Sequence, residues 1–120
     1  MKNCLVLDDS DVIRKVACHI LGDLRIKASE VDTGANALER CHLQMPDAIL
    51  VDWHMPEMSG TDFISALSEI DAPKPYVIYC TTENDHEDIT RAINAGADDY
   101  MLKPLDRETI RAKMVEAGMI

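Results

Sequence analysis

The sequence predicts an α/β fold, a (βα)5 chain that forms an open, doubly wound five-stranded parallel sheet with helices on both faces. Short apolar runs alternate with stretches of helical period, and this alternation repeats five times. A chain of 120 residues is too short to close an eight-stranded barrel. Right-handed crossovers then favour the strand order 2-1-3-4-5, which is common among five-stranded sheets.

Five strands are expected at residues 3–8, 26–31, 48–52, 76–80 and 98–102. The second, Ile26-Lys27-Ala28-Ser29-Glu30-Val31, is more polar than the others and is therefore expected at an edge of the sheet. Pro73 and Pro75 favour an extended chain that leads into the fourth strand.

The first two helices are expected after the first two strands. Gly22 is expected to stop the first helix, and Thr33 to cap the second, which ends before Pro46. The apolar positions with helical spacing are Val12, Ile13, Val16, Ala17, Ile20 and Leu21 in the first, and Ala35, Leu38 and Cys41 in the second.

The last three helices follow the last three strands. Thr61 is expected to cap the third, Asn84 or Asp85 the fourth, and Asp106 the fifth. Gly96 is expected to end the fourth. Their apolar sides carry Phe63, Ile64, Leu67 and Ile70 in the third, Ile89, Ala92 and Ile93 in the fourth, and Ile110, Met114 and Val115 in the fifth.

The composition indicates one globular domain over residues 1–120. No apolar stretch approaches the roughly 18 residues that a membrane span requires, and the first residues carry no signal-peptide core. The formal net charge of −10 disfavours direct binding to nucleic acid, because the phosphate backbone is itself negative. We therefore expect a cytoplasmic protein that neither inserts into a membrane nor binds DNA.

The four cysteines are Cys4, Cys18, Cys41 and Cys80. They have neither a Cys-x-x-Cys spacing nor a pairing with histidine that suits zinc. We expect them to be small core residues in a reducing compartment.

Charged or hydroxyl side chains stand where predicted strands end. Asp8 and Asp9 follow the first, Asp52 ends the third, Thr81 follows the fourth and Lys103 follows the fifth. In the order 2-1-3-4-5 the first and third strands are neighbours, and open α/β sheets bind ligands at the carboxyl ends of such a pair. Three crowded carboxylates require neutralisation by a divalent cation. The sequence therefore predicts a Mg²⁺-type pocket with one carboxylate left free to react.

This set of side chains suits phosphoryl transfer. Mg²⁺ binds a few carboxylates together with waters and phosphate oxygens, so Asp9, Asp52 and a backbone carbonyl are expected to supply its protein ligands. Asp8 either holds one of the waters or enters the coordination shell. A carboxylate beside the metal can act as a nucleophile and form an acyl phosphate. Lys103 would then pair with the phosphoryl group, and Thr81-Thr82 supply a hydroxyl at the neighbouring strand end.

The motifs at these strand ends resemble those of the receiver domain of bacterial two-component response regulators, and in particular its stand-alone, chemotaxis-type (CheY-like) members. They are Leu7-Asp8-Asp9-Ser10, Asp52-Trp53-His54-Met55-Pro56-Glu57-Met58-Ser59-Gly60, Thr81-Thr82-Glu83, Gly96-Ala97-Asp98-Asp99-Tyr100 and Lys103-Pro104. The resemblance covers essentially the whole chain, and it implies a flavodoxin-like sheet. The segment that begins at Asp52 is highly specific.

The resemblance implies that Asp52 accepts a phosphoryl group from a sensor histidine kinase. It also implies that Asp9, Asp52 and the main-chain carbonyl of His54 bind Mg²⁺, with Asp8 assisting. Such a protein takes part in its own phosphorylation and dephosphorylation, and it is a signalling protein and not an enzyme.

The resemblance further implies that Lys103 and the Thr81 hydroxyl hold the phosphoryl oxygens, and that the Lys103-Pro104 peptide is cis. On phosphorylation Thr81 would move toward the phosphate and Tyr100 would turn inward. This change would alter the face formed by the fourth helix, fifth strand and fifth helix, where a downstream target protein is expected to dock. We expect a monomer. The output is open between chemotaxis through the flagellar motor, a phosphate-sink role and another pathway.

Two residues depart from the chemotaxis type. His54 stands where asparagine is frequent, and Leu105 where phenylalanine is frequent. Metal binding is expected to survive, because the family uses the main-chain carbonyl at position 54. His54 and Glu83 each lie two residues beyond a site residue, so their side chains are expected to tune dephosphorylation. Leu105 is expected to change only local packing.

Two other classes of protein fit the same residues less well. A small phosphotransferase or phosphatase acting on an external substrate through an aspartyl-phosphate usually has a second aspartate two residues after the nucleophile, where this chain has His54. A flavodoxin-like cofactor module needs a Ser/Thr/Gly-rich phosphate loop after the first strand. Here Asp8-Asp9-Ser10 would repel a flavin phosphate.

Overall fold

Five parallel strands form one sheet in the order β2-β1-β3-β4-β5 in the computed structural model of the protein, as predicted. The structure describes residues 1–52, 55, 57–82 and 86–120. The strands are β1 (Asn3–Leu7), β2 (Lys27–Val31), β3 (Ala48–Asp52), β4 (Tyr76–Thr81) and β5 (Asp99–Leu102). Each lies within one residue of its predicted bounds, and the polar β2 lies at an edge of the sheet.

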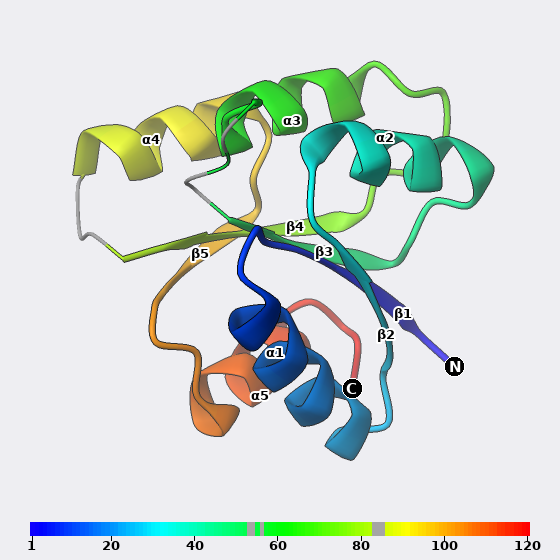
Figure 1. Cartoon of the computed structure of the whole chain (residues 1–120), viewed down its shortest axis with the longest axis vertical. Helices are drawn as coiled ribbons and strands as arrows, with labels where there is room; N and C mark the ends of the chain where they lie inside the picture. Colours follow the sequence, from blue (N-terminus) through cyan, green and yellow to red (C-terminus); the bar gives the residue numbers. More distant parts are fainter. Residues whose placement is uncertain (53–54, 56, 83–85) are drawn as a thin grey trace.

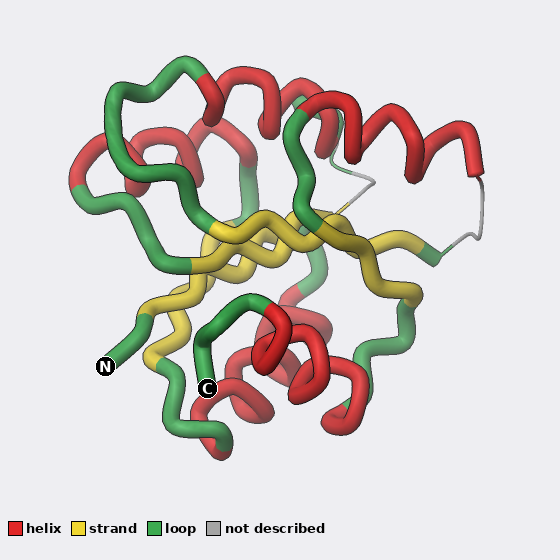
Figure 2. The backbone as a smooth tube through the Cα atoms, turned by 180° about the vertical axis from the view of Figure 1, so that it is seen from behind, coloured by secondary structure: helices red, strands yellow, loops and turns green. Residues whose placement is uncertain are grey.

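Helices cover both faces of this sheet (Figure 1). They are α1 (Asp11–Asp23), α2 (Gly34–Leu43), α3 (Gly60–Ser68), α4 (His86–Ala95) and α5 (Arg107–Glu116). The view from behind in Figure 2 also places α1 and α5 on one face and α2, α3 and α4 on the other. Among the described helices, none is long and apolar enough to cross a membrane.

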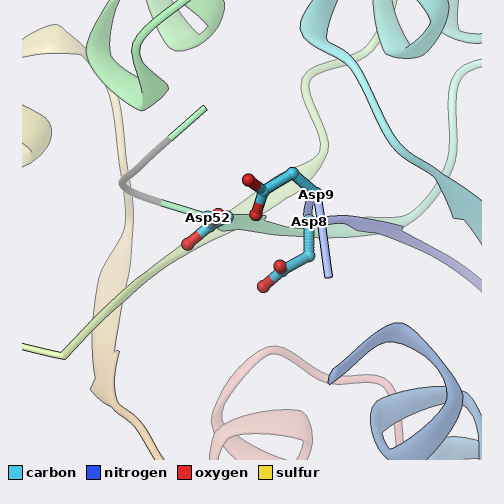
Figure 3. Close-up of side chains that lie close together, drawn as sticks. All are labelled: Asp8, Asp9 and Asp52. Carbon is cyan, nitrogen blue, oxygen red and sulfur yellow. The ribbon is translucent and has the colours of Figure 1, made fainter. Parts of the chain in front are cut away.

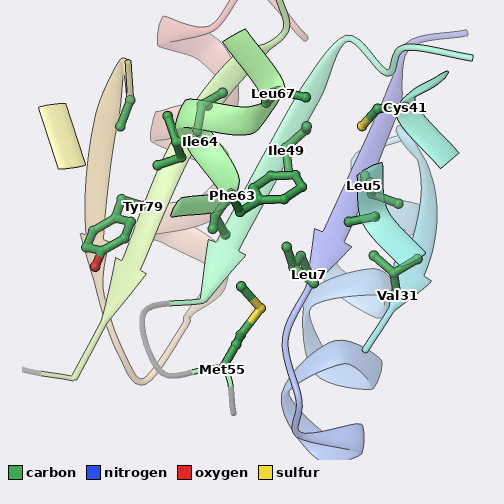
Figure 4. Close-up of a cluster of buried hydrophobic side chains, with 14 of the residues drawn as sticks. Leu5, Leu7, Val31, Cys41, Ile49, Met55, Phe63, Ile64, Leu67 and Tyr79 are labelled. Carbon is green, nitrogen blue, oxygen red and sulfur yellow. The ribbon is translucent and has the colours of Figure 1, made fainter. Parts of the chain in front are cut away.

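Two separate cores follow from the two-residue period of the strands, since successive side chains point to opposite faces. On the side of α2, α3 and α4, the strands contribute Leu5, Leu7, Ile49, Val51, Val77 and Tyr79, which pack with Phe63, Ile64 and Leu67 of α3 (Figure 4). On the side of α1 and α5, they contribute Cys4, Val6, Ala48, Leu50, Ile78, Cys80 and Met101, which pack with Ala17, Leu21, Ile110 and Met114. The sheet therefore separates the two cores.

The helix caps agree with the sequence in two cases and differ in a third. The side chains of Thr33 and Asp106 cap α2 and α5 as predicted, each accepting a main-chain N–H three residues on. The prediction that Thr61 caps α3 is wrong, because Ser59 takes that position. Ser59 has an extended backbone and its Oγ accepts the N–H of Asp62 at 3.1 Å, whereas Thr61 already lies in the helix.

The helix ends show one further correction. The prediction that Gly22 stops α1 is wrong, because the helix continues past it. The left-handed turn is made instead by Arg25, with φ 64°. Gly96 does end α4 and has φ 128°, a backbone conformation that favours glycine. The predicted caps of α4, Asn84 and Asp85, lie outside the described residues.

Some apolar helix residues face solvent. Val115, which was expected to point inward, is 47% exposed on α5, and Val12 and Val16 of α1 are 71% and 44% exposed. The buried side of α1 is formed by Arg14, Ala17, Ile20 and Leu21. An arginine thus occupies the first position of the side that faces the sheet.

The four cysteines are free. Three are buried and Cys18 is half-buried, as expected for core residues. Burial raises the pKa of Cys41 to about 11 and that of Cys80 to about 12. These two thiols therefore stay protonated at neutral pH.

Candidate functional site

The carboxyl ends of four adjacent strands meet at one edge of the sheet. The register pairs Leu7 with Val51, Asp52 with Cys80, and Thr81 with Leu102. Asp8 therefore lies beside Asp52, and Lys103 follows the strand next to Thr81. One carboxylate oxygen from each of Asp8, Asp9 and Asp52 lies within 4.8 Å of the others (Figure 3). The predicted convergence of these side chains is present in the structure.

The two-residue period of the strands explains which side chains meet. Even-numbered residues of β1 and β3 point toward α1 and α5, and Asp8 and Asp52 continue that alternation past Val6 and Leu50. Lys103 continues the same alternation past Met101 of β5 and so points to the side of α1 and α5. Three strand ends thus deliver two carboxylates and one ammonium group to the same side of the sheet.

The ammonium group of Lys103 joins the two buried carboxylates. Its Nζ lies 2.8 Å from Oδ2 of Asp8 and 2.7 Å from Oδ1 of Asp52. Its main-chain N–H donates to the carbonyl of Thr81 at 2.8 Å. This bond holds the chain that follows β5 against the end of β4. The Lys103-Pro104 peptide is cis, as the resemblance implied.

Burial differs among the three carboxylates. Asp8 and Asp52 are each 3% exposed, whereas Asp9 faces solvent. Burial raises the pKa of Asp52, Lys103 acts in the opposite direction, and the charges of Asp8 and Asp9 raise the pKa further. The resulting pKa lies above the ordinary value of an aspartate. Ionised Asp52 is therefore costly in the metal-free protein.

Lys103 shows the complementary shift. Burial lowers its pKa, but hydrogen bonds to Asp52 and Asp8 outweigh burial and raise the pKa above its ordinary value. Lys103 is therefore a stable internal cation at neutral pH. One such cation does not balance three carboxylates, so the site retains an excess of negative charge.

The residues present fit a magnesium ion. Carboxylate oxygens are hard donors, and Mg²⁺ binds to one or two carboxylates while it keeps several waters and phosphate oxygens. The exposed Asp9 and the buried Asp52 offer such oxygens from neighbouring strand ends. A divalent cation there would offset both burial and the charges of Asp8 and Asp9, which raise the pKa of Asp52.

Gly60 allows α3 to begin close to Asp52. A Cβ atom at Gly60 would lie 2.7 Å from Cε1 of Tyr79 and 2.9 Å from the carbonyl oxygen of Asp52. Real Cβ atoms do not approach so closely, so a side chain here would displace the end of β3 or of β4. Gly60 thus permits the close packing that holds Asp52 in place.

The other predicted site residues differ in their setting. Thr81 is 2% exposed at the end of β4. Tyr100 is 37% exposed on β5, and the Nζ of Lys113 lies 5.7 Å from the centre of its ring. His54 and Glu83, predicted to tune dephosphorylation, lie outside the described residues.

Two residues near the site, Ser10 and Arg14, were given no role of their own from the sequence. The Oγ of Ser10 accepts the N–H of Ile13 and caps α1, while its own N–H donates to Oδ1 of Asp8 at 2.9 Å. Arg14 donates from Nη1 to the main-chain carbonyl of Asp8 at 2.7 Å. The position of Ser10 directly before a helix could have identified it as a cap. The spacing of Arg14, three residues before Ala17, could have placed it on the buried side of α1.

Comparison with known proteins agrees with this geometry. A model of the response regulator receiver domain matches residues 4–115. The chain belongs to the response regulator receiver domain family, whose members are signalling proteins of two-component systems.

Relatives of known identity belong to the same family. The chain is 32% identical over 109 residues to the chemotaxis protein CheY of Halobacterium salinarum, covering 91% of this chain and 90% of that protein. It is 32% identical over 117 residues to the phosphate regulon transcriptional regulatory protein PhoB of Escherichia coli. That alignment covers 94% of this chain but 50% of PhoB, so the chain spans about half the length of that relative.

A solved structure confirms the fold. The chemotaxis protein CheY4 of Vibrio cholerae superimposes with a TM-score of 0.91 at 27% identity, over 98% of each chain. The protein is thus a CheY-like receiver domain, with a role in a phosphorelay.

Proposed function

We propose that residues 1–120 form a single receiver domain in which Asp52 accepts a phosphoryl group from a sensor histidine kinase in a Mg²⁺-dependent reaction. Phosphorylation then changes the binding of a downstream target protein. The proposal includes a cytoplasmic, monomeric protein that binds no DNA, inserts into no membrane and acts on no external substrate.

The observation that carries this proposal is the position of Asp52. Asp52 is 3% exposed, its carboxylate accepts a hydrogen bond from Lys103 and lies close to those of Asp8 and Asp9, and it belongs to the strand next to that of Asp8. Of the three carboxylates, it alone is both buried and part of β3, which lies between β1 and β4. A nucleophile in this position is in contact with a cation and close to the other candidate metal ligands.

The transfer itself requires a new bond between phosphorus and a carboxylate oxygen of Asp52, while the bond between phosphorus and the donor nitrogen breaks. A bound Mg²⁺ would neutralise charge on the phosphoryl oxygens during this transfer. Asp9, Asp52 and the main-chain carbonyl of His54 would hold it, with Asp8 assisting. Lys103 would meet a phosphoryl oxygen, and burial of Asp52 would limit access of water.

The target would bind on the face formed by α4, β5 and α5. These elements expose large apolar side chains, among them Ile93 of α4, Tyr100 and Leu102 of β5, and Val115 of α5. Thr81 would move toward the phosphoryl group and Tyr100 would turn inward, so the state of Asp52 would be sensed at this surface. The output we propose is chemotaxis, by analogy with the chemotaxis relatives.

The lifetime of the phosphoryl group would be set in part by His54 and Glu83. Polar side chains along the path of the hydrolytic water can orient or block it. Replacing His54 with Asn is expected to change the dephosphorylation rate several-fold, with little effect on Mg²⁺ affinity, because only the main chain would serve the metal. Equal decay rates between pH 6 and 8 would remove His54 from this role.

The proposed function is tested by phosphorylation with a small-molecule phosphodonor and Mg²⁺. Intact-mass spectrometry should show one added phosphoryl group on the natural protein and none on Asp52→Asn. Asp71→Asn carries the same charge change at an exposed loop and should be phosphorylated like the natural protein. An acid-stable, base-labile adduct on Asp52→Asn would overturn the assignment of the phosphoacceptor.

A further inference from the structure

The side chain of Arg14 is buried beside the candidate site, with 10% of its surface exposed. A buried guanidinium is costly unless its donors are satisfied. Here Nη1 donates to the carbonyl of Asp8 at 2.7 Å, Nε donates to Oε1 of Glu30 at 3.1 Å, and Nη2 donates to Asp11. The planar fork of arginine suits three partners that lie in different directions.

These contacts complete the anchoring of Asp8. Its N–H donates to the carbonyl of Val31 at 3.2 Å, its Oδ1 accepts the N–H of Ser10, and its Oδ2 accepts Lys103. Arg14 satisfies the remaining polar group, the main-chain carbonyl. Each polar group of Asp8 is therefore held by a different residue.

The carbonyl that Arg14 holds belongs to the peptide that joins Asp8 to Asp9. The orientation of this peptide decides where the Asp9 side chain leaves the backbone. Glu30 of the edge strand β2 accepts a hydrogen bond from the same guanidinium, so Arg14 links the peptide to β2. A rotation of the peptide would move two of the three clustered carboxylates at once.

We infer that Arg14 is a positioning residue of the metal and phosphoryl site: it fixes the Asp8-Asp9 peptide so that both carboxylates converge with Asp52. This inference rests on the proposed function. For the change in Mg²⁺ affinity when Arg14 is removed, positioning and simple electrostatics predict opposite signs. A positive charge near a cation site weakens cation binding, so its removal alone would tighten Mg²⁺ binding. Loss of positioning would weaken it.

The matched control is Lys15, the next residue of α1. Its Nζ contacts Oε2 of the same Glu30 at 2.9 Å, but its side chain is 70% exposed, and none of its described contacts is to Asp8. Arg14→Met and Lys15→Met therefore remove the same charge and the same acidic partner. They differ in burial and in the contacts with Asp11, which is itself exposed, and with the Asp8 carbonyl.

The experiment is a Mg²⁺ titration of the natural protein, Arg14→Met, Arg14→Lys and Lys15→Met, followed by the fluorescence of Trp53, the single tryptophan. Contacts that orient metal ligands typically change metal affinity by about 10–100-fold, so Arg14→Met should raise the Kd about tenfold. Arg14→Lys keeps the charge without the fork and should raise it by a smaller factor. Lys15→Met should leave it unchanged or slightly lower it.

Two further readouts separate positioning from a general loss of stability. Urea unfolding gives the folded fraction of each variant, and the amide resonance of Asp9 in the metal-free protein should shift in Arg14→Met but not in Lys15→Met. If Arg14→Met does not fold, Arg14→Lys decides the matter alone. A Kd equal to or below that of the natural protein in the folded Arg14 variants would overturn the inference. Failure of the natural protein itself to bind Mg²⁺ would instead overturn the proposed function.

Discussion

The Nζ atom of Lys103 lies 2.7 Å from Oδ1 of Asp52, although the two residues are 51 positions apart in the sequence. The same atom reaches Asp8, so one ammonium group is shared by two buried carboxylates. Removing the shared cation would leave two negative charges buried together. This relationship makes Lys103 a structural residue of the metal-free protein as well as a candidate contact for the phosphoryl group.

Replacing Lys103 with Met is therefore expected to destabilise the metal-free protein. Breaking a buried ion pair by removing one partner costs about 3–5 kcal/mol. Urea unfolding in the presence of a chelator measures this loss, and added Mg²⁺ should restore part of it because a second cation replaces the lost charge. Lys15→Met breaks an exposed pair with Glu30 and should cost less than about 1 kcal/mol. Equal stability of the two variants would contradict the interpretation.

Replacing Asp9 with Asn should weaken Mg²⁺ binding while the fold is retained. The Asp9 carboxylate is exposed, so its loss leaves no unpaired buried group. The expected rise in Kd is about tenfold, equivalent to ~1.4 kcal/mol of binding free energy. Trp53 fluorescence follows the titration, and Asp71→Asn is the control for the change in net charge. An unaltered Kd in Asp9→Asn would exclude this carboxylate from the metal site.

Replacing Gly60 with Ala should destabilise the protein and slow phosphorylation of Asp52. The new Cβ would meet the ring of Tyr79 and the carbonyl of Asp52, and overpacking of this kind costs about 1–3 kcal/mol. Gly22 is the matched control, because a Cβ there meets no atom within 4 Å. Gly22→Ala should stabilise α1 by about 0.5–1 kcal/mol. Chemical denaturation measures the free energy of unfolding of both variants, which should fall in Gly60→Ala and rise in Gly22→Ala. Destabilisation by Gly22→Ala as well would contradict the role given to packing at Gly60.

Replacing Asp52 with Asn should stabilise the metal-free protein at pH 7. The pKa of Asp52 is raised in the folded state, so folding favours the protonated side chain. The stability that Asp52 contributes is present below its unfolded pKa of about 3.9 and is lost as the pH rises through the higher folded pKa. The advantage of the Asp52→Asn variant over the natural protein should therefore shrink as the pH falls from 7 toward 4. Urea titrations across this range measure it, and a gain independent of pH would argue against ionisation as its cause.

The strand order and the convergence of Asp8, Asp9, Asp52 and Lys103 were predictable, because they follow from the alternation of apolar runs and from right-handed crossovers. The caps of α2 and α5 were predictable, because Thr33 and Asp106 each stand directly before the helix. Ser59 and Thr61 both suit a cap, and the choice depends on where the helix begins, which is Gly60 in the packed structure.

The role of Arg14 could not be predicted for a similar reason. An arginine on a helix is usually solvated, whereas the donors of this buried side chain are satisfied by Asp8 and Asp11, which are near it in sequence, and by Glu30 of β2. Gly22 was misjudged because a glycine near a helix end is a common stop signal, yet the left-handed position fell on Arg25. Local sequence patterns thus predicted which helices and strands form. The packed structure decided where the helices end and which polar side chains are buried.

The separation of the two cores has a consequence for how such a domain can diversify. Residues that share no contacts contribute nearly additively to stability, so the layer of α1 and α5 and the layer of α2, α3 and α4 can exchange side chains almost as independent modules. The strand ends are the exception. Asp52 and Lys103 continue the alternation of one layer and Thr81 that of the other, so variation is freest in the helices and most constrained at the single edge where both layers meet.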